Sequence, residues 1–472
     1  MAADQTTLAW ETLLDLEHGP GPLVVRLERA LRDAVGSGRL PAGATLPASR
    51  RLAESLGISR WVVTEAYGQL VAEGVLDARV GAGTRVAPGQ PGPTPSGAAP
   101  RSGAVQALPP RPRFDLRPGV PDLRHVPRDT WLKAAREALA IATNDDLATS
   151  PGAGHPAARA AVVAHLRRAR LVDAPDTAVV VTRGATDAMG RVVAALHAAG
   201  HTHLLVEDPS WPVLRDVARR GGLEPVPVPV DGGGIDVHRL TEAAARTGAR
   251  ALLLTPAHQF PTGVALAGDR RDAVLGWARS VDGLVIEDDY DAEFRYDRRP
   301  VAALQRLDPD RVVLLGSVSK TMSPAFGIGW MVLPETWRAA VSGAGQAGPP
   351  SVVEQLTFAR FLTDGGYDRH LRAARGRYRR RHDALAAAVR AALPGARLGG
   401  MAAGLHAVLD LPASAPDAAE VVRAAAAHDV GVVDLRRYQV RPSARSRTLV
   451  LGYGNLVDAR LEEAVARLAS CV

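Results

Sequence analysis

The sequence of 472 residues contains a single cysteine, Cys471. One thiol forms no intrachain disulfide and no cysteine-based metal cluster, so we expect a reducing compartment and no metal site of that kind. The sequence also lacks any run of about 18 apolar residues. Its first segment is acidic and has neither a basic start nor a long apolar core. We therefore expect neither export nor membrane insertion, and a cytoplasmic protein.

Lysine is almost as scarce as cysteine. Of 57 basic residues only Lys133 and Lys320 are lysines, which leaves 55 arginines. A guanidinium group stays charged and does not condense with a carbonyl compound, so chemistry that needs a side-chain amine has two candidates. The net charge of +7 permits a polyanionic partner without identifying one.

The composition divides the chain into two folded parts. Residues 88–113 hold 8 prolines and 4 glycines in 26 positions, which is typical of a semi-extended linker. This linker separates an N-terminal domain, residues 1–87, from a C-terminal domain, residues 114–472. The second is long enough for a large α/β domain and a smaller lobe.

The N-terminal domain has the pattern of a winged helix-turn-helix. Apolar residues at helical spacing predict helices over 23–35 and 49–56, and Ser59 caps a third helix that stops at Gly74. The short connection from Gly57 to Ser59 between two helices indicates a helix-turn-helix. Two β-prone segments then flank the glycine-rich residues 81–83, which predicts a hairpin, or wing.

Such a domain binds double-stranded DNA through its second helix and its wing. The candidate DNA-binding residues are Arg50, Ser59, Arg60, Trp61, Thr64, Arg79, Gly83 and Thr84. The alternative is a protein-interaction module with solvated arginines, and charge does not decide between them, since residues 1–87 have a net charge of −1. The pattern, rather than the charge, favours DNA.

The C-terminal domain alternates β-branched segments with helical ones from residue 178 to residue 315. Repeated strand–helix alternation predicts an α/β fold with a largely parallel sheet. From about residue 376 a long arginine- and alanine-rich helix, short strands and a last helix over 458–469 indicate a small α+β lobe.

Lys320 lies at the end of an apolar strand, with Ser317 and Ser319 shortly before it. An amine at a buried strand end can lose its proton and condense with an aldehyde, and serines at these positions can bind a phosphate. This combination suits pyridoxal 5′-phosphate. The other lysine, Lys133, lies in an amphipathic helix and is expected at the surface.

A pyridoxal site also needs a carboxylate for the ring nitrogen and a phenol near the ring oxygen. Asp288 and Tyr290 follow a buried strand and supply both, although an acidic loop closing the strand would look the same. Three further parts of such a site occur after successive predicted strands. They are a strand–helix turn for the phosphate, Trp211 to stack on the ring, and a tight turn at 258–263 that lines the cofactor pocket. The residues predicted for the phosphate turn are Gly184, Ala185 and Thr186.

These strings resemble known families. The segment PAGATLPASRRLAESLGISRWVVTEAYGQL with the wing GAGTRV is similar to GntR-type regulators, and TPAHQFPTG, IEDDYDAEFRY and LLGSVSKTMSP are similar to class I aminotransferases of fold-type I. Both together resemble the MocR/GabR subfamily over residues 22–470. The resemblance implies that Lys320 forms the internal aldimine, that Asp288 and Tyr290 contact the ring, and that Ser317 and Ser319 contact the phosphate.

The sequence departs from the family patterns at two places and leaves one further assignment open. The arginine that pairs the cofactor phosphate seven residues after the lysine in the family is Gly327 here, so either another arginine substitutes, with Arg183 the nearest candidate, or cofactor binding is weak. For the carboxylate of an amino-acid ligand Arg447 is the candidate, with Arg436 and Arg437 as rivals. In the second helix of the DNA-binding motif the usual small residue and threonine are Trp61 and Val62.

A DNA-binding domain joined to a small-molecule domain is the arrangement of a one-component transcription factor. We expect a regulator that responds to pyridoxal phosphate, or to an amino acid or amine bound through it. The resemblance implies a head-to-tail homodimer, and residual or partial transaminase activity is compatible with the site. Two alternatives stay open: an active aminotransferase with a DNA-binding appendage, and a cofactor-free regulator with a vestigial aminotransferase domain.

Overall fold

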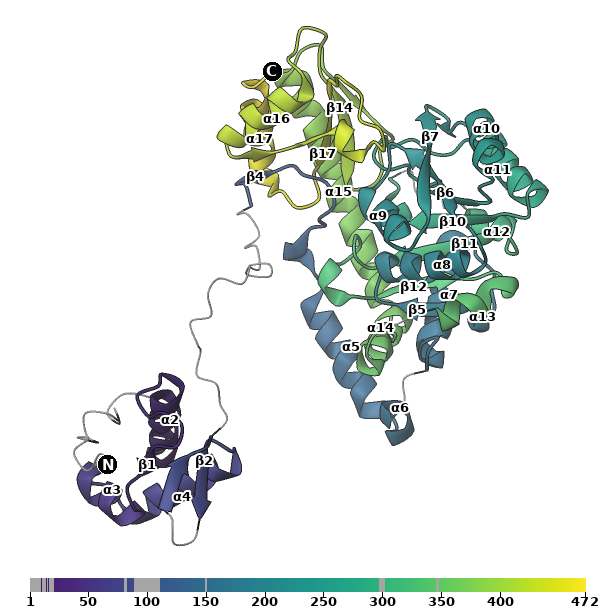
Figure 1. The fold of residues 1–472 in the computed structure, drawn as a ribbon. Coiled ribbons are helices and arrows are strands. Elements are labelled where there is room, and N and C mark those ends of the chain that lie inside the picture. The colour runs from purple at the N-terminus through teal and green to yellow at the C-terminus, as the bar shows by residue number, and fades with distance from the viewer. Residues whose placement is uncertain are drawn as a thin grey trace. The chain divides into compact units, whose positions relative to one another are not determined.

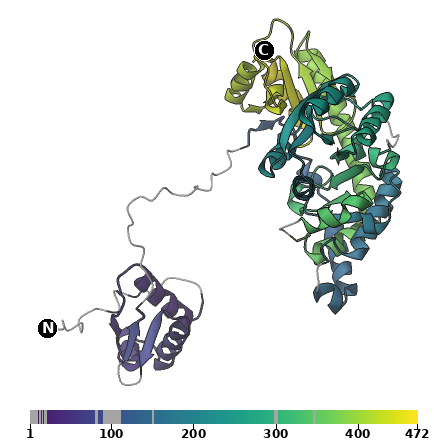
Figure 2. The same cartoon turned by 45° about the vertical axis from the view of Figure 1, so that its right-hand side comes forward.

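The computed structural model describes residues 10, 14, 16, 21–79, 83–88, 111–148, 151–296, 302–344 and 348–472. The chain divides into two compact units, residues 1–109 and 110–472. Figures 1 and 2 show the elements of each unit. No helix among the described residues combines the length and the apolar character needed to cross a membrane.

The first unit is a helix-turn-helix with a wing. Its elements are α2 (Leu23–Gly36), β1 (Thr45–Leu46), α3 (Ser49–Leu56), α4 (Arg60–Ala72), β2 (Leu76–Arg79) and β3 (Gly83–Val86). The strands form an antiparallel sheet in the order β1-β3-β2. The predicted helices and hairpin are therefore present. Gly81 and Ala82, at the predicted tip of the wing, lie outside the described residues.

Local sequence explains the turn between α3 and α4. Gly57 ends α3 in the left-handed conformation at φ +63°, which costs glycine little. Ser59 caps α4, and its hydroxyl accepts a hydrogen bond from the Val62 amide. Leu27, Leu52 and Leu70, from three different helices, are buried in one common core.

The second unit is built on an eight-stranded sheet in the order β5-β12-β11-β10-β9-β6-β7-β8. The strands are β5 (Val179–Thr182), β6 (His203–Asp208), β7 (Glu224–Asp231), β8 (Gly234–Ile235), β9 (Ala251–Leu254), β10 (Leu284–Asp289), β11 (Val312–Ser317) and β12 (Gly329–Val332). From β7 through β6, β9 and β10 to β11 the strands are parallel. The prediction of a largely parallel sheet is confirmed, but β12 runs antiparallel between β11 and β5, which the sequence did not indicate.

Helices cover both faces of this sheet, so central strands such as β10 and β11 are buried at every residue. Neighbouring residues of β10 point to opposite faces: Ile286 packs with the residues of one core cluster and Val285 with those of another. The helices of this unit before the small lobe are α5 (Arg128–Ile141), α6 (Asn144–Ala148), α7 (Pro156–Arg170), α8 (Ala185–Ala198), α9 (Pro212–Arg220), α10 (Val237–Thr247), α11 (Gly268–Ser280), α12 (Leu304–Leu307), α13 (Glu335–Gly343) and α14 (Val352–Thr363). Short 3-10 turns lie at 123–125, 176–178, 292–294 and 324–326.

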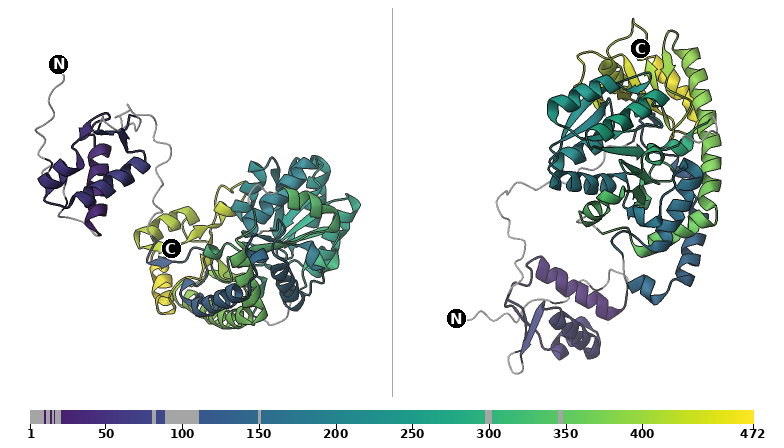
Figure 3. Two further views of the ribbon diagram at one scale, coloured as in Figure 1. Left: turned by 90° about the horizontal axis from the view of Figure 1, so that it is seen from below. Right: turned by 90° about the vertical axis from the view of Figure 1, so that its right-hand side faces the viewer.

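The long helix α15 (Gly366–Ala392) runs from the large domain into the small lobe, as the right-hand view of Figure 3 shows. The lobe has a sheet in the order β13-β14-β17-β16 and a separate pair of β15 with β4. Its elements are β4 (Phe114–Asp115), β13 (Arg397–Gly399), β14 (His406–Asp410), α16 (Ala418–Ala427), β15 (Val430–Gly431), β16 (Val433–Asp434), β17 (Thr448–Gly452) and α17 (Leu461–Ala469), with 3-10 turns at 435–438 and 458–460. The predicted α+β lobe is confirmed, with its first helix beginning ten residues earlier, at Gly366.

Candidate functional site

A cavity of about 360 Å³ lies at the carboxyl ends of β5, β6, β10 and β11. The strands of a parallel sheet end at one edge, so residues that follow them in sequence meet there. The cavity is lined by Gly119, Arg183, Gly184, Ala185, Thr186, Trp211, Val213, Leu214, Phe260, Asp288, Tyr290, Ser317, Ser319, Lys320, Pro324, Leu405 and His406. The structure thus brings together all nine residues that the sequence analysis assigned to the cofactor.

Lys320 places its amine inside this cavity. Nζ donates a hydrogen bond of 2.6 Å to the carbonyl oxygen of Gly119 and lies 5.3 Å from the centroid of the Trp211 ring. Burial lowers the pKa of the amine below its usual value, although the negative charges of Asp288 and Asp291 oppose this shift. A larger share of the neutral, nucleophilic form follows, which is what condensation with an aldehyde requires.

Asp288 is the acid at the floor of the cavity. Burial raises the pKa of its carboxyl group to about 7; the charge of Lys320 lowers it and that of Asp291 raises it further. Among the described residues, none forms a hydrogen bond with the buried atom Oδ1. A buried carboxylate oxygen without a partner fits a ligand with a positively charged N–H group, such as a protonated pyridine ring.

Two residues that were not singled out from the sequence, His258 and Asp291, position Tyr290. Nδ1 of His258 lies 3.1 Å from the Tyr290 hydroxyl and 2.8 Å from a carboxylate oxygen of Asp291. Burial, followed by the charges of Asp291 and Asp288, raises the pKa of Tyr290 well above its usual value, so the phenol keeps its proton. His258 lies in the 258–263 turn and Asp291 adjoins Tyr290, and their nearness to motif residues was the available signal.

His406 closes the small-lobe side of the cavity and was also missed. Burial, with the nearby His258, lowers the pKa of its imidazole well below the usual value, so the ring is neutral. Its Nε2 lies 3.2 Å from the carbonyl oxygen of Pro261. A single histidine at the start of a short strand gives no signal in a sequence.

The other end of the cavity suits an anion. Gly184 has φ +110° and precedes α8, so the amides of the first turn of this helix, from Ala185 and Thr186, face outward without helical partners. The Thr182 hydroxyl donates to the Gly184 carbonyl at 3.2 Å, and the Ser317 hydroxyl accepts from the Ser319 amide at 3.4 Å. This turn, together with Ser317 and Ser319, which also line the cavity, fits the phosphate of a phosphorylated ligand.

Gly327 supplies no charged side chain to the phosphate site, as the sequence indicated. This residue ends the 3-10 turn Pro324–Phe326 at φ +58°, and a Cβ there would meet no heavy atom within 4 Å. Arg183, the substitute suggested by the sequence, does line the cavity. The lining therefore fits a phosphorylated pyridine aldehyde.

Arg447 lies elsewhere. Its Nε donates to the carbonyl oxygen of Ala415, and the residue lines a separate hollow of about 620 Å³ in the small lobe. Arg436 lines the same hollow and is paired with Asp417 and Asp434. Neither lines the cavity around Lys320, because β17 begins one residue after Arg447 and approaches the cavity only at its far end, where Gly452 pairs with His406.

The candidate DNA-binding residues lie on the outer face of α3, α4 and the wing. Arg50, Arg60, Trp61, Thr64 and Gly83 are exposed and Thr84 is half-buried, whereas the side chain of Arg79 lies outside the described residues. The Trp61 side chain is 66% exposed, although an indole is normally buried. Ser59 is occupied as the cap of α4, so its contribution to this face is to position Arg60 and Trp61.

Comparison with known proteins agrees with both halves. Residues 114–468 match the family described as Aminotransferase class I and II, and residues 23–86 match Bacterial regulatory proteins, gntR family. The chain is 32% identical over 459 residues to the HTH-type pyridoxine biosynthesis transcriptional regulator PdxR of Corynebacterium glutamicum, covering 96% of this chain and 97% of that protein. It is 31% identical to the probable rhizopine catabolism regulatory protein MocR of Rhizobium meliloti, over 78% and 77% of the two chains.

Among solved structures, the kynurenine aminotransferase of Pyrococcus horikoshii, in complex with PMP, superposes with a TM-score of 0.69 at 22% identity. The match covers 76% of this chain and 90% of that one, and at this identity it shows the fold alone. The winged helix-turn-helix, the aminotransferase fold and the full-length similarity lead to one conclusion. The chain belongs to the family of MocR- and PdxR-type transcriptional regulators, in which a GntR-type helix-turn-helix domain precedes an aminotransferase class I and II domain.

Proposed function

We propose that this regulator binds pyridoxal 5′-phosphate covalently through Lys320 and that occupation of the cavity changes its binding to operator DNA. The observation that carries the proposal is the pairing of an amine of lowered pKa with a buried acid, Asp288, whose Oδ1 has no partner among the described residues. Both features destabilise the cavity without a ligand and are relieved by a phosphorylated pyridine aldehyde.

Besides Lys320, eight of the residues that line the cavity have a role in this proposal. Asp288 holds a proton on the ring nitrogen, Tyr290 donates to the ring oxygen, and Trp211 stacks on the ring. Gly184, Ala185 and Thr186, with Ser317 and Ser319, bind the phosphate. Pyridoxal phosphate supplies an electrophilic aldehyde and an electron-withdrawing ring when bound.

The effector that best fits the site is a vitamin B6 compound. The relative at 32% identity carries pyridoxine biosynthesis in its name, and a relative at 30% identity is a vitamin B6 salvage pathway transcriptional repressor, PtsJ of Salmonella typhimurium. An amino acid or amine that reacts with the bound aldehyde is the second effector class. Among the described residues that line the cavity, Arg183 is the sole guanidinium, and a ligand carboxylate would compete with the phosphate for it.

On the DNA side, the exposed face of α4 enters the major groove, and the wing contacts the phosphate backbone. Arg50, Arg60, Trp61 and Thr64 read or hold the DNA from α3 and α4, and Arg79, Gly83 and Thr84 do so from the wing. A head-to-tail homodimer in the cytoplasm places two such domains on one operator, as the family resemblance implies.

The test uses the full-length protein and pyridoxal phosphate. We expect a visible absorbance band on titration, and borohydride reduction should fix the cofactor to the peptide that contains Lys320. Lys320→Ala should abolish both signals. Lys133→Ala is the matched control, because this second lysine is 70% exposed on α5 and pairs with Glu137.

The outcomes separate the alternatives. Operator affinity that changes with pyridoxal phosphate in the wild type but not in Lys320→Ala supports the regulator. Steady-state turnover of an amino donor with a keto acceptor would instead favour an active aminotransferase, for which the intact Lys320–Asp288–Tyr290 group is the supporting observation. A protein that stays colourless in excess pyridoxal phosphate would favour the cofactor-free regulator.

A further inference from the structure

One segment connects the cavity, the small lobe and the start of the C-terminal domain. We call residues 117–125 the strap. It follows β4 after one residue, Leu116, and β4 pairs with β15 of the small lobe and is the first strand after the predicted linker. The strap then passes the cavity at Gly119 and reaches the first helices of the large domain through the 3-10 turn Leu123–His125.

The strap touches Lys320 with its backbone. The Gly119 carbonyl accepts the 2.6 Å hydrogen bond from Nζ, and Gly119 has φ +108°, a conformation that side chains disfavour. A Cβ built on Gly119 would lie 3.6 Å from both Nζ and the Trp211 ring. The strap is therefore in van der Waals contact with the group that we propose receives the aldehyde.

The first half of the strap lies on the end of β17. The Gly452 amide donates to the Leu116 carbonyl at 2.7 Å. A Cβ on Gly452 would lie 2.5 Å from the Arg117 carbonyl oxygen, and one on Gly454 would lie 2.6 Å from that of Val120. Only glycine at these two positions allows the strap to approach the lobe so closely.

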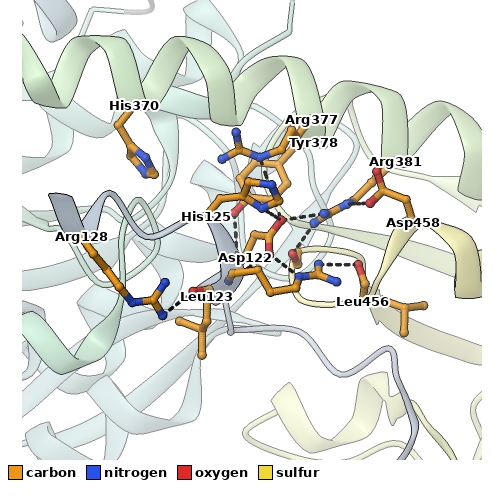
Figure 4. A network of polar contacts seen from close by, with 12 residues as sticks. Asp122, Leu123, His125, Arg128, His370, Arg377, Tyr378, Arg381, Leu456 and Asp458 are labelled. Atoms are coloured by element: carbon orange, nitrogen blue, oxygen red, sulfur yellow. Dashed lines mark hydrogen bonds and ion pairs between the residues drawn. The ribbon is translucent and has the colours of Figure 1, made fainter. Parts of the chain in front are cut away.

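The second half is anchored by the buried carboxylate of Asp122, drawn at the centre of Figure 4. It accepts hydrogen bonds from Arg381 of α15 at 2.6 Å and from Arg124 at 2.8 Å, and it lies 2.8 Å from Nδ1 of His125. The same Arg381 is bonded to Asp458 and donates to the Gly454 carbonyl at 2.6 Å. One charged network thus ties the strap to the long helix and to the small lobe.

We propose that the strap is the relay by which the state of the Lys320 amine reaches the entry of the domain, an inference that rests on the proposed function. When the neutral amine condenses with an aldehyde, a carbon–nitrogen double bond forms and both N–H protons leave with the aldehyde oxygen as water. The imine nitrogen then carries no proton. If it becomes protonated again, its single N–H donates to the ring oxygen and not to Gly119. Gly119 loses its donor while Asp122 stays anchored, so the strap moves between β4 and Asp122.

Hydrogen exchange of the full-length protein tests this relay without any change to the strap. Saturating pyridoxal phosphate should speed exchange of the amides of Leu116 and Gly452, which lie beside the released contact. The Asp122 amide, which donates to Tyr378 at 2.9 Å, and the helix α11 should stay unchanged. In Lys320→Ala pyridoxal phosphate should have no effect on any of these amides.

A variant pair tests whether the anchor transmits the signal. Asp122 does not line the cavity, so Asp122→Asn should bind pyridoxal phosphate as the wild type does while its operator affinity responds less than about twofold. The control is Glu463→Gln, which removes an exposed acid of the same lobe that pairs with Arg467 and should leave the response unchanged.

Three results would overturn the relay. An absorbance band without altered exchange at Leu116 and Gly452 would refute the relay and leave the proposed function intact. A wild-type DNA response in Asp122→Asn would do the same. No absorbance band in the wild type would refute the relay together with the proposed function on which it rests.

Discussion

Gly329 of β12 and Gly184 before α8 are in direct backbone contact: a Cβ on Gly329 would lie 2.6 Å from the Cα of Gly184. It would also lie 2.8 Å from the carbonyl oxygen of Gly316. The antiparallel strand β12 thus fixes the position of the turn whose amides we assign to the phosphate. The contact exists because β12 pairs with both β11 and β5.

Gly329→Ala should therefore displace the phosphate turn. We expect the affinity for pyridoxal phosphate to fall about tenfold or more and the free energy of unfolding to fall by about 1–3 kcal/mol, because the new methyl group meets backbone on two sides. Absorbance titration and chemical denaturation measure the two effects. The control is Gly276→Ala in α11, where a Cβ meets nothing within 4 Å. It should stabilise the protein by about 0.5–1 kcal/mol and leave cofactor affinity unchanged.

Gly327→Arg should restore the charge that the family pattern has at this position. A charge-assisted bond to the phosphate is worth about 1.5–3 kcal/mol, and the left-handed backbone at φ +58° costs a side chain about 1–2 kcal/mol. Gly327→Ala carries the backbone strain without the charge. We expect Gly327→Arg to bind pyridoxal phosphate about tenfold or more tightly than Gly327→Ala. Equal affinities of the two variants would show that Arg183 already satisfies the phosphate.

Trp61 and Arg60 should contribute to DNA binding in different ways. Arg60→Ala should weaken binding and reduce the salt dependence by about one released counterion, because we propose that its guanidinium contacts a phosphate. Trp61→Ala should weaken operator binding without changing the salt dependence. Because the Trp61 side chain is 66% exposed, Trp61→Ala should alter the free energy of unfolding by less than about 0.5 kcal/mol. Operator affinity that is unaltered in Trp61→Ala would remove this residue from the interface.

Asp122→Asn should show a pH-dependent loss of stability. Burial alone would raise the pKa of Asp122, but hydrogen bonds from Arg124 and Arg381 outweigh it and lower the pKa from 3.8 to about 2. A lowered carboxyl pKa stabilises the folded state above the unfolded pKa, and this stabilisation disappears as the pH falls through the folded one. We expect a deficit of about 2 kcal/mol at pH 7 that shrinks between about pH 4 and pH 2.

The control for this experiment is Asp173→Asn. Asp173 pairs with Arg167 at the surface, with side chains 82% and 62% exposed, so its removal should cost less than about 0.5 kcal/mol. Denaturant unfolding across the pH range measures both variants. A deficit in Asp122→Asn that is constant from pH 7 to pH 2 would contradict an ionised Asp122 as its source.

Prediction from sequence worked best where a residue acts on its immediate neighbours. Helix α3 has the predicted bounds, 49–56, because Gly57 ends it in the left-handed conformation. The nine residues predicted for the cofactor line one cavity for a related reason: each lies at or just after the end of a strand, and parallel strands end at one edge. Arg447 does not line this cavity, because the strand after it runs toward the cavity and leaves Arg447 at its distant end.

By itself, the sequence determined the helix-turn-helix and the α/β architecture, and it predicted the roles of Lys320, Asp288 and Tyr290, because these depend on local spacing and on residue type. Tertiary structure alone decided the antiparallel place of β12, the support of Tyr290 by His258, and the anchoring of Asp122 by Arg381, which is 259 residues away. Contacts of this kind arise when distant segments pack together, and a hydrogen bond between them leaves no periodic trace along the chain.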